Sequence, residues 1–160
     1  MSDRILHPFG PLFNAESRVL ILGSFPSVKS RETQFFYGHP QNRFWKVVAA
    51  VFQQEVPETI EQKKELILLN RLALWDSIAS CEITGSSDAS IRAVCANDLS
   101  VILNRCPIRM ICCNGKTSWK LYEKLIRPAT GMEAVCLPST SPANAQWTLE
   151  RLTEAWRIIL

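Results

Sequence analysis

The segment RVLILG, residues 18 to 23, indicates the class of fold before any other part of the chain. It is a short apolar run that ends in glycine, which is typical of a buried parallel strand leading into a loop. From position 43 onward the apolar residues change to helical spacing: Phe44, Val47, Val48, Val51 and Phe52. We therefore expect a strand, then a long connection, then a helix.

The rest of the chain repeats this alternation. Apolar segments at 72–76, 109–113 and 134–137 resemble the first strand. Helices are expected at 58–69, after the Ser/Gly-rich loop 84–90 and before Pro107, at 117–126, and after Thr148, a favourable N-cap. The last helix would bury a stripe of apolar side chains, namely Leu149, Leu152, Trp156, Ile159 and Leu160.

This order of elements predicts the architecture. No two of the expected strands are joined by a tight hairpin, so they should pair in parallel beneath helices. We expect an α/β fold, a three-layer α/β/α sandwich with a central parallel sheet of about four strands. A length of 160 residues with 47% apolar residues fits one domain, residues 1–160.

Charge and cysteine content limit the possible functions. The net charge is only +3, but bases exceed acids in segments 17–54 and 106–147. A modest basic face and ordinary surface charge explain this equally well. The six cysteines contain no C-x-x-C pair and lie far from the two histidines, so they suggest neither a zinc site nor an iron-sulfur cluster.

The N-terminal sequence MSDRILHPFG has no apolar run of signal-peptide length, and no stretch approaches a membrane span. We therefore expect a cytoplasmic monomer with reduced thiols, most of them small core residues, and no membrane partner.

Polar residues follow each expected strand. In open α/β sheets, ligands bind beyond the carboxyl ends of the strands. Those ends here are 23–27, 76–77, 114–116 and 138–144. The sequence therefore places a binding site along this one edge.

The connection after the first strand contains FFYGHPQNRFW, residues 35 to 45. Its aromatic rings could stack on a nucleobase, worth about 1–3 kcal/mol per base, or could hold the loop against the sheet. We expect at least two to fold inward and Tyr37 to face a ligand. Asn42 could cap the following helix or orient a water molecule. His39 could satisfy the turn or donate to developing negative charge.

The other strand ends are also open to two interpretations. Asp76 can simply cap a turn, and Asn114 can form a turn with Gly115 or read a base edge. The hydroxyl-rich segment 139–142 suits phosphate contacts but also resembles an ordinary capping loop.

Four motifs taken together resemble the uracil-DNA glycosylase superfamily: GSFPS (23–27), YGHPQNRFWKV (37–47), NGK (114–116) and LPSTSPAN (137–144). The second is similar to mismatch-specific uracil/thymine-DNA glycosylases, and the first and fourth to the DNA-deoxyinosine (hypoxanthine-DNA) glycosylase branch. The resemblance implies a flipped base in a pocket at the carboxyl edge of the sheet and N-glycosidic hydrolysis without metal or cofactor.

The resemblance also implies roles for individual residues. Tyr37 would stack on the flipped base, and residues 139–143 would grip the DNA backbone and push into the gap. The substrate-binding set is Gly23, Ser24, Phe25, Tyr37 and Asn114. The DNA-binding set is Ser27, Lys116, Ser139, Thr140, Ser141, Pro142, Ala143 and Asn144.

Three departures from the family pattern affect the chemistry. Phe25 stands where many members carry an Asp or Asn that positions the attacking water, so the resemblance moves this duty to Asn42. His39 or Asn114 would stabilise the departing base. Leu137 replaces a histidine of some relatives, and Ser141 and Ala143 make a small wedge.

The first hypothesis is therefore a monofunctional DNA glycosylase that removes hypoxanthine, with uracil and xanthine as further substrates, from double-stranded DNA. Single-stranded DNA is left open as a substrate. The alternatives are a mismatch-specific uracil/thymine-DNA glycosylase, a non-catalytic nucleotide- or DNA-binding module, and a hydrolase of free nucleosides.

Overall fold

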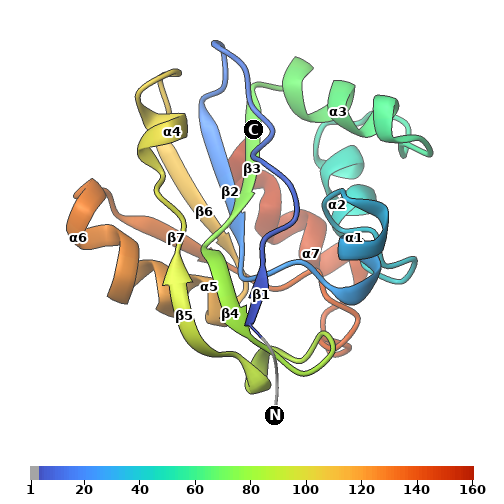
Figure 1. Ribbon diagram of the computed structural model, residues 1–160. Helices are drawn as coiled ribbons and strands as arrows, with labels where there is room; N and C mark the ends of the chain where they lie inside the picture. Colours follow the sequence, from blue (N-terminus) through green and yellow to red (C-terminus); the bar gives the residue numbers. More distant parts are fainter. Residues whose placement is uncertain (1–3) are drawn as a thin grey trace.

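The computed structural model describes residues 4–160, and a parallel sheet forms its centre (Figure 1). The sheet is four-stranded with the order β3-β2-β6-β7. Its strands are β2 (Val19–Gly23), β3 (Leu72–Asp76), β6 (Met110–Asn114) and β7 (Ala134–Leu137). All neighbouring pairs are parallel. The predicted central sheet is confirmed, and β2 and β3 are buried at every position.

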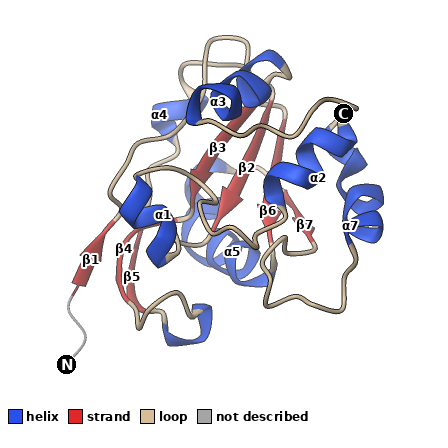
Figure 2. Cartoon of the chain, turned by 90° about the vertical axis from the view of Figure 1, so that its right-hand side faces the viewer, coloured by secondary structure: helices blue, strands red, loops and turns tan. Residues whose placement is uncertain are grey.

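Helices cover both faces of this sheet, which confirms the three-layer arrangement (Figure 2). On one side α2 (Phe44–Val51) packs against α7 (Leu149–Trp156). On the other side α5 (Lys116–Leu121) packs on β6 and β7 and continues through a π-helical turn, Tyr122–Ile126, into α6 (Arg127–Thr130). The helix α3 (Ile60–Leu69) lies against β3.

A second sheet was not predicted. It is antiparallel, with the order β1-β4-β5, and consists of β1 (Arg4–Leu6), β4 (Ile78–Glu82) and β5 (Arg92–Ala96). The strands β4 and β5 were not expected, and they form a hairpin whose connection, residues 83–91, contains the predicted Ser/Gly-rich loop 84–90. These strands are short and irregularly paired, so they carry no clear alternation of polar and apolar residues.

The helix expected between residue 90 and Pro107 is also largely wrong. Only α4 (Ser100–Leu103) forms there, after β5. Conversely, the long connection before α2 contains a helix that the sequence did not predict, α1 (Val28–Thr33), whose N-cap Ser27 accepts a hydrogen bond from the Ser30 N–H. Six mostly polar residues are too few to show helical periodicity.

The interior largely agrees with the sequence. Phe35 and Phe36 are buried, as expected for at least two loop aromatics. Thr148 caps α7 by accepting from the Arg151 N–H. Leu149 and Leu160, however, are exposed, because they lie at the two ends of the stripe.

The cysteines divide between core and surface. Cys81, Cys106, Cys112 and Cys113 are buried, whereas Cys95 and Cys136 are exposed. Across residues 4–160, we find no helix with both the length and the apolar character that crossing a membrane requires.

Candidate active site

A cavity of about 570 Å³ opens at the carboxyl edge of the parallel sheet. The last residues of three strands, Gly23, Asp76 and Asn114, line it. Three segments complete the walls: the connection after β2 between residues 24 and 42, segment 139–143 after β7, and segment 86–89 from the β4–β5 hairpin. The sheet thus brings together residues that are far apart in the chain, at the edge where α/β folds bind ligands.

Asn42, Thr140 and Asn114 form a neutral hydrogen-bonded group, here called the amide cluster. Oδ1 of Asn42 accepts from the Phe44 N–H and from the Thr140 hydroxyl, both at 2.9 Å. Asn114 binds Thr140 twice, since its Nδ2 donates to the hydroxyl and its Oδ1 accepts from the backbone N–H, both at 3.0 Å. These bonds fix the orientation of both amides.

The amide cluster decides what Asn42 can do. Its oxygen accepts from the N–H of Phe44, the first residue of α2, so the side chain caps the helix from the position before the N-cap residue, Arg43. Its Nδ2 donates no hydrogen bond to residues 4–160, and Asn42 lines the cavity. Because a backbone N–H must meet the oxygen, the group left for the cavity is the NH₂ donor.

Thr140 and Arg43 position the 139–143 loop. Thr140 is fully buried and its hydroxyl is engaged in the amide cluster, which does not fit the phosphate contact expected of its side chain. Arg43, which the sequence did not single out, donates through its guanidinium to the carbonyl oxygens of Ser141, Asn144 and Trp147. One planar side chain therefore joins the loop to the start of α2.

Tyr37 lies between the core and the cavity. Its ring stacks on Phe44 with the centroids 4.0 Å apart and 20° between planes, so one face is already covered. Its hydroxyl is buried and has no hydrogen-bond partner in residues 4–160. Burial raises the pKa of Tyr37, as does the negative charge of Asp76, so the hydroxyl stays protonated.

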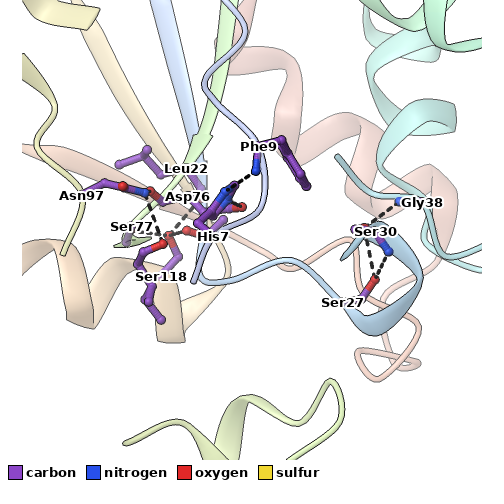
Figure 3. A network of polar contacts seen from close by, with 12 residues as sticks. His7, Phe9, Leu22, Ser27, Ser30, Gly38, Asp76, Ser77, Asn97 and Ser118 are labelled. Atoms are coloured by element: carbon purple, nitrogen blue, oxygen red, sulfur yellow. Dashed lines mark hydrogen bonds and ion pairs between the residues drawn. The ribbon is translucent and has the colours of Figure 1, made fainter. Parts of the chain in front are cut away.

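Asp76 pairs with His7, and neither was assigned a site role from the sequence (Figure 3). His7 Nε2 lies 2.6 Å from Asp76 Oδ2, and the side chains are only 4% and 6% exposed. The Phe9 N–H donates to His7 Nδ1 at 3.4 Å, which leaves the ring proton on Nε2 to be donated to Asp76. We call His7, Asp76 and Tyr37 the carboxylate cluster.

Gly23 is required by the carboxylate cluster. A Cβ atom at this position would collide with Oδ1 of Asp76 and lie 3.2 Å from the Tyr37 hydroxyl. The Asp76 carboxylate cannot move aside easily, because His7 holds its other oxygen. Only glycine at residue 23 therefore lets the Asp76 carboxylate and the Tyr37 hydroxyl lie this close to the backbone of β2.

The remaining predicted residues lie around this centre. His39 Nδ1 accepts from the Gln41 N–H at 3.1 Å, so the ring satisfies its own turn and keeps an Nε2–H donor at the cavity. Phe25 is buried in the wall, beneath the Arg31 guanidinium. Ser24, Ser27, Ser139, Ser141, Pro142 and Ala143 also line the cavity, whereas Lys116 and Asn144 do not.

The 86–89 segment adds a second carboxyl group that the sequence did not indicate. Asp88 accepts from the Ser24 hydroxyl at 2.9 Å, and the Ser86 hydroxyl accepts from the Val28 N–H at 2.9 Å. Partial burial of its carboxyl group raises the pKa of Asp88, and the charge of Asp76 raises it further, whereas the Ser24 hydroxyl lowers it. Within residues 4–160, no three His, Cys, Asp or Glu side chains are grouped as a metal site would require.

Comparison with known proteins agrees with this arrangement. The model of the uracil DNA glycosylase superfamily matches residues 11–160. A Methanosarcina acetivorans protein named hypoxanthine DNA glycosylase is 34% identical over 153 residues, covering 94% of this chain and 95% of its own. A Methanosarcina barkeri protein of the same name is 30% identical, covering 92% and 93% of the two chains.

A solved structure has the same fold. The solution NMR structure of a candidate uracil DNA glycosylase from Methanosarcina acetivorans superposes with a TM-score of 0.79 at 32% identity. The match covers 94% of this chain and 96% of that one. The chain therefore belongs to the uracil DNA glycosylase superfamily.

Proposed function

We propose that this protein is a monofunctional DNA glycosylase that hydrolyses the N-glycosidic bond of a deaminated base, hypoxanthine first, with uracil and xanthine as further substrates. The observation that carries the proposal is the cavity at the carboxyl edge, where the family motifs converge. The two relatives named hypoxanthine DNA glycosylase support the choice of base.

Base flipping explains why such a site is a cavity. The reactive carbon of a nucleotide cannot be reached inside a duplex, so the base must enter the protein. About 570 Å³ accommodates a purine. Phe44 covers one face of Tyr37, and we propose that Tyr37 meets the edge of the base through its hydroxyl and does not stack on it as the resemblance implied.

Asn42 is proposed to hold the attacking water. Its Nδ2 can donate to the water oxygen and leave a lone pair directed at the sugar carbon, while the amide cluster prevents rotation. An amide is a poor base, but an oxocarbenium-like transition state needs a positioned water more than a deprotonated one. Phe25 cannot bind water, so no residue at that position competes for this role.

The departing base carries developing negative charge, and the cavity offers donors for it. His39 presents an Nε2–H and Tyr37 a protonated hydroxyl. Donors fixed in place before the reaction stabilise such charge without reorganisation. The glycosidic bond breaks with its electron pair on the base, the water oxygen bonds to the sugar carbon, and the proton that the water then loses passes to the departing base anion or to solvent.

The DNA backbone is proposed to lie across the mouth of the cavity. Pro142 and Ala143 are exposed there, and Arg43 keeps their loop in place. Hydroxyl and amide groups for contacts with the backbone come from Ser27, Ser139, Ser141 and Asn144. Lys116, two residues after Asn114, is exposed and adds a positive charge. We propose double-stranded DNA as the substrate and a monomer as the active form.

Excision assays on labelled duplexes test this function. Duplexes containing deoxyinosine, deoxyuridine or deoxyxanthosine, with undamaged duplexes as controls, are incubated with excess protein and then cleaved with alkali at abasic sites. We expect the fastest strand cleavage for deoxyinosine and none without alkali. Faster cleavage of U·G and T·G pairs than of deoxyinosine would indicate a mismatch-specific enzyme. Tight binding without cleavage would indicate a binding module, and cleavage of free deoxyinosine alone a nucleosidase.

A further inference from the structure

Asp76 is a buried carboxylate on the cavity wall whose charge the proposed hydrolysis does not use. The residue is 4% exposed, yet it lines the cavity. Burying a charge is costly unless it is hydrogen-bonded, and here the Nε2–H of His7 donates to the carboxylate. Such a group at a cavity is a candidate for ligand recognition.

Only one of its two carboxylate oxygens is occupied. Oδ2 accepts from His7 at 2.6 Å, and the backbone oxygen of Asp76 accepts from Asn97 at 2.8 Å, which fixes the end of β3 (Figure 3). Oδ1 accepts no hydrogen bond from residues 4–160 and lies against Gly23, whose missing side chain leaves it open. An ionised carboxylate can only accept, so Oδ1 presents a pure acceptor.

A matching donor lies beside it. The Tyr37 hydroxyl approaches the same glycine, is buried, and has no partner in residues 4–160. Since it stays protonated, it can donate. An acceptor, Asp76 Oδ1, and a donor, the Tyr37 hydroxyl, therefore lie on either side of Gly23. Such a pair is complementary to a ring N–H that stands next to a carbonyl group.

We propose that Asp76, oriented by His7, accepts a hydrogen bond from the ring N–H of a lactam base, while Tyr37 donates to the neighbouring carbonyl oxygen. Hypoxanthine presents this pair as N1–H and O6, and uracil and xanthine present equivalent pairs. Adenine has an acceptor at N1 and would face the carboxylate with a lone pair. The inference rests on the proposed function, because it names the part of the flipped base that the protein recognises, the ring N–H and the neighbouring carbonyl group.

The Asp76→Asn variant tests the reading directly. His7 donates from Nε2, so the carboxamide oxygen turns toward His7 and the NH₂ group faces the cavity. The acceptor becomes a donor. We expect excision of deoxyinosine to fall about 10- to 100-fold, whereas excision of unsubstituted purine, whose N1 is an acceptor, is unchanged or rises. Asp98→Asn, at an exposed position, serves as the matched control.

A double variant distinguishes recognition of the base by Asp76 from a purely structural role of the His7–Asp76 pair. In the His7→Phe/Asp76→Asn double variant, nothing forces the amide oxygen away from the cavity, so the acceptor can return. Deoxyinosine excision should recover about 5- to 10-fold relative to Asp76→Asn, although a second stabilising contact has been removed. If the pair only joined the N-terminal segment to β3, the double variant would be no better than Asp76→Asn, and the inference would be overturned.

Binding of free bases keeps this inference separate from the proposed function. Titration of the wild-type protein with hypoxanthine, 1-methylhypoxanthine and purine, followed by NMR, requires neither catalysis nor a variant. We expect hypoxanthine to bind at least about tenfold more tightly than the other two. If no duplex is cleaved but this preference holds, the proposed function fails and the reading stands. If deoxyinosine is excised but the three bases bind equally, the function stands and the reading fails.

Discussion

The amide cluster and the carboxylate cluster line the same cavity but are built differently. The amide cluster is neutral, and backbone N–H groups on both sides fix its orientation. The carboxylate cluster is charged, and a single side chain holds it, that of His7, which directly follows β1 outside the central sheet. The neutral cluster suits a water that is positioned but not deprotonated before it attacks, and the charged cluster suits recognition of an N–H group. The variants below affect one cluster at a time.

Gly23→Ala should have the largest effect. The new Cβ would collide with Asp76 Oδ1 and crowd the Tyr37 hydroxyl, which displaces both ends of the carboxylate cluster. We expect single-turnover excision to fall about 10²-fold or more, since small displacements of reacting groups are costly. Overpacking should also lower the free energy of unfolding by about 1–3 kcal/mol in urea denaturation. Gly10→Ala is the control, because nothing lies within 4 Å of its Cβ position; equal rates for both variants would contradict this account.

Thr140→Val breaks the amide cluster without changing its shape much. It removes the donor to Asn42 and the acceptor for Asn114, and leaves the Asn114 NH₂ group buried without that partner. We expect a loss of about 1–3 kcal/mol in unfolding free energy and a fall in excision of about tenfold. Thr153→Val provides the comparison, because Thr153 is half-buried on α7 away from the cavity and its hydroxyl donates only to the Leu149 carbonyl oxygen one turn earlier. An active, equally stable Thr140→Val protein would show that the cluster does not position Asn42.

Arg43→Lys loosens the loop that the amide cluster supports. Lysine keeps the charge but cannot donate to three carbonyl groups in one plane. We expect affinity for damaged duplex to weaken by about 3- to 10-fold, with a smaller effect on the rate of excision in the bound state. Fluorescence anisotropy measures the affinity, and Arg109→Lys, at an exposed position outside the cavity, is the reference. A change in excision rate with unchanged affinity would be the opposite of this expectation.

Asp88→Asn should have the smallest effect and concerns the charge near Asp76. A raised pKa in the folded protein means that ionisation of Asp88 opposes folding. The stability of the wild-type protein should therefore fall as pH rises from below the ordinary pKa of 3.8 through the raised folded value, and the variant should lack this loss. Urea denaturation should find the variant more stable at pH 7, with the difference vanishing below about pH 3. A variant less stable at pH 7 would exclude this electrostatic cost.

The sequence predicted the parts of this molecule that depend on local pattern. The strands 72–76 and 134–137 were located to the residue, because their apolar runs are continuous. The cavity edge followed from where those strands end. The capping role of Asn42 was also foreseen, since Asn favours the position before a helix.

The parts that the sequence did not predict depend on contacts between distant segments. His7 meets Asp76 across 69 positions, and β1 must pair with β4 before they can touch. Arg43 contacts backbone carbonyl groups about 100 positions away. Every residue has such a group, so the sequence does not indicate which of them Arg43 binds. The burial of Thr140 similarly results from the amide cluster and not from its own loop.

The most direct test of the account compares two helix caps. Asn42→Ala and Thr148→Ala each remove a cap, so each should lower the unfolding free energy by about 1 kcal/mol. Only Asn42 also lines the cavity. The account predicts that single-turnover excision of deoxyinosine falls by about 10²- to 10³-fold in Asn42→Ala and changes less than twofold in Thr148→Ala, with duplex affinity retained in both. Equal excision rates in the two variants would show that Asn42 is a cap alone and would contradict the proposed mechanism.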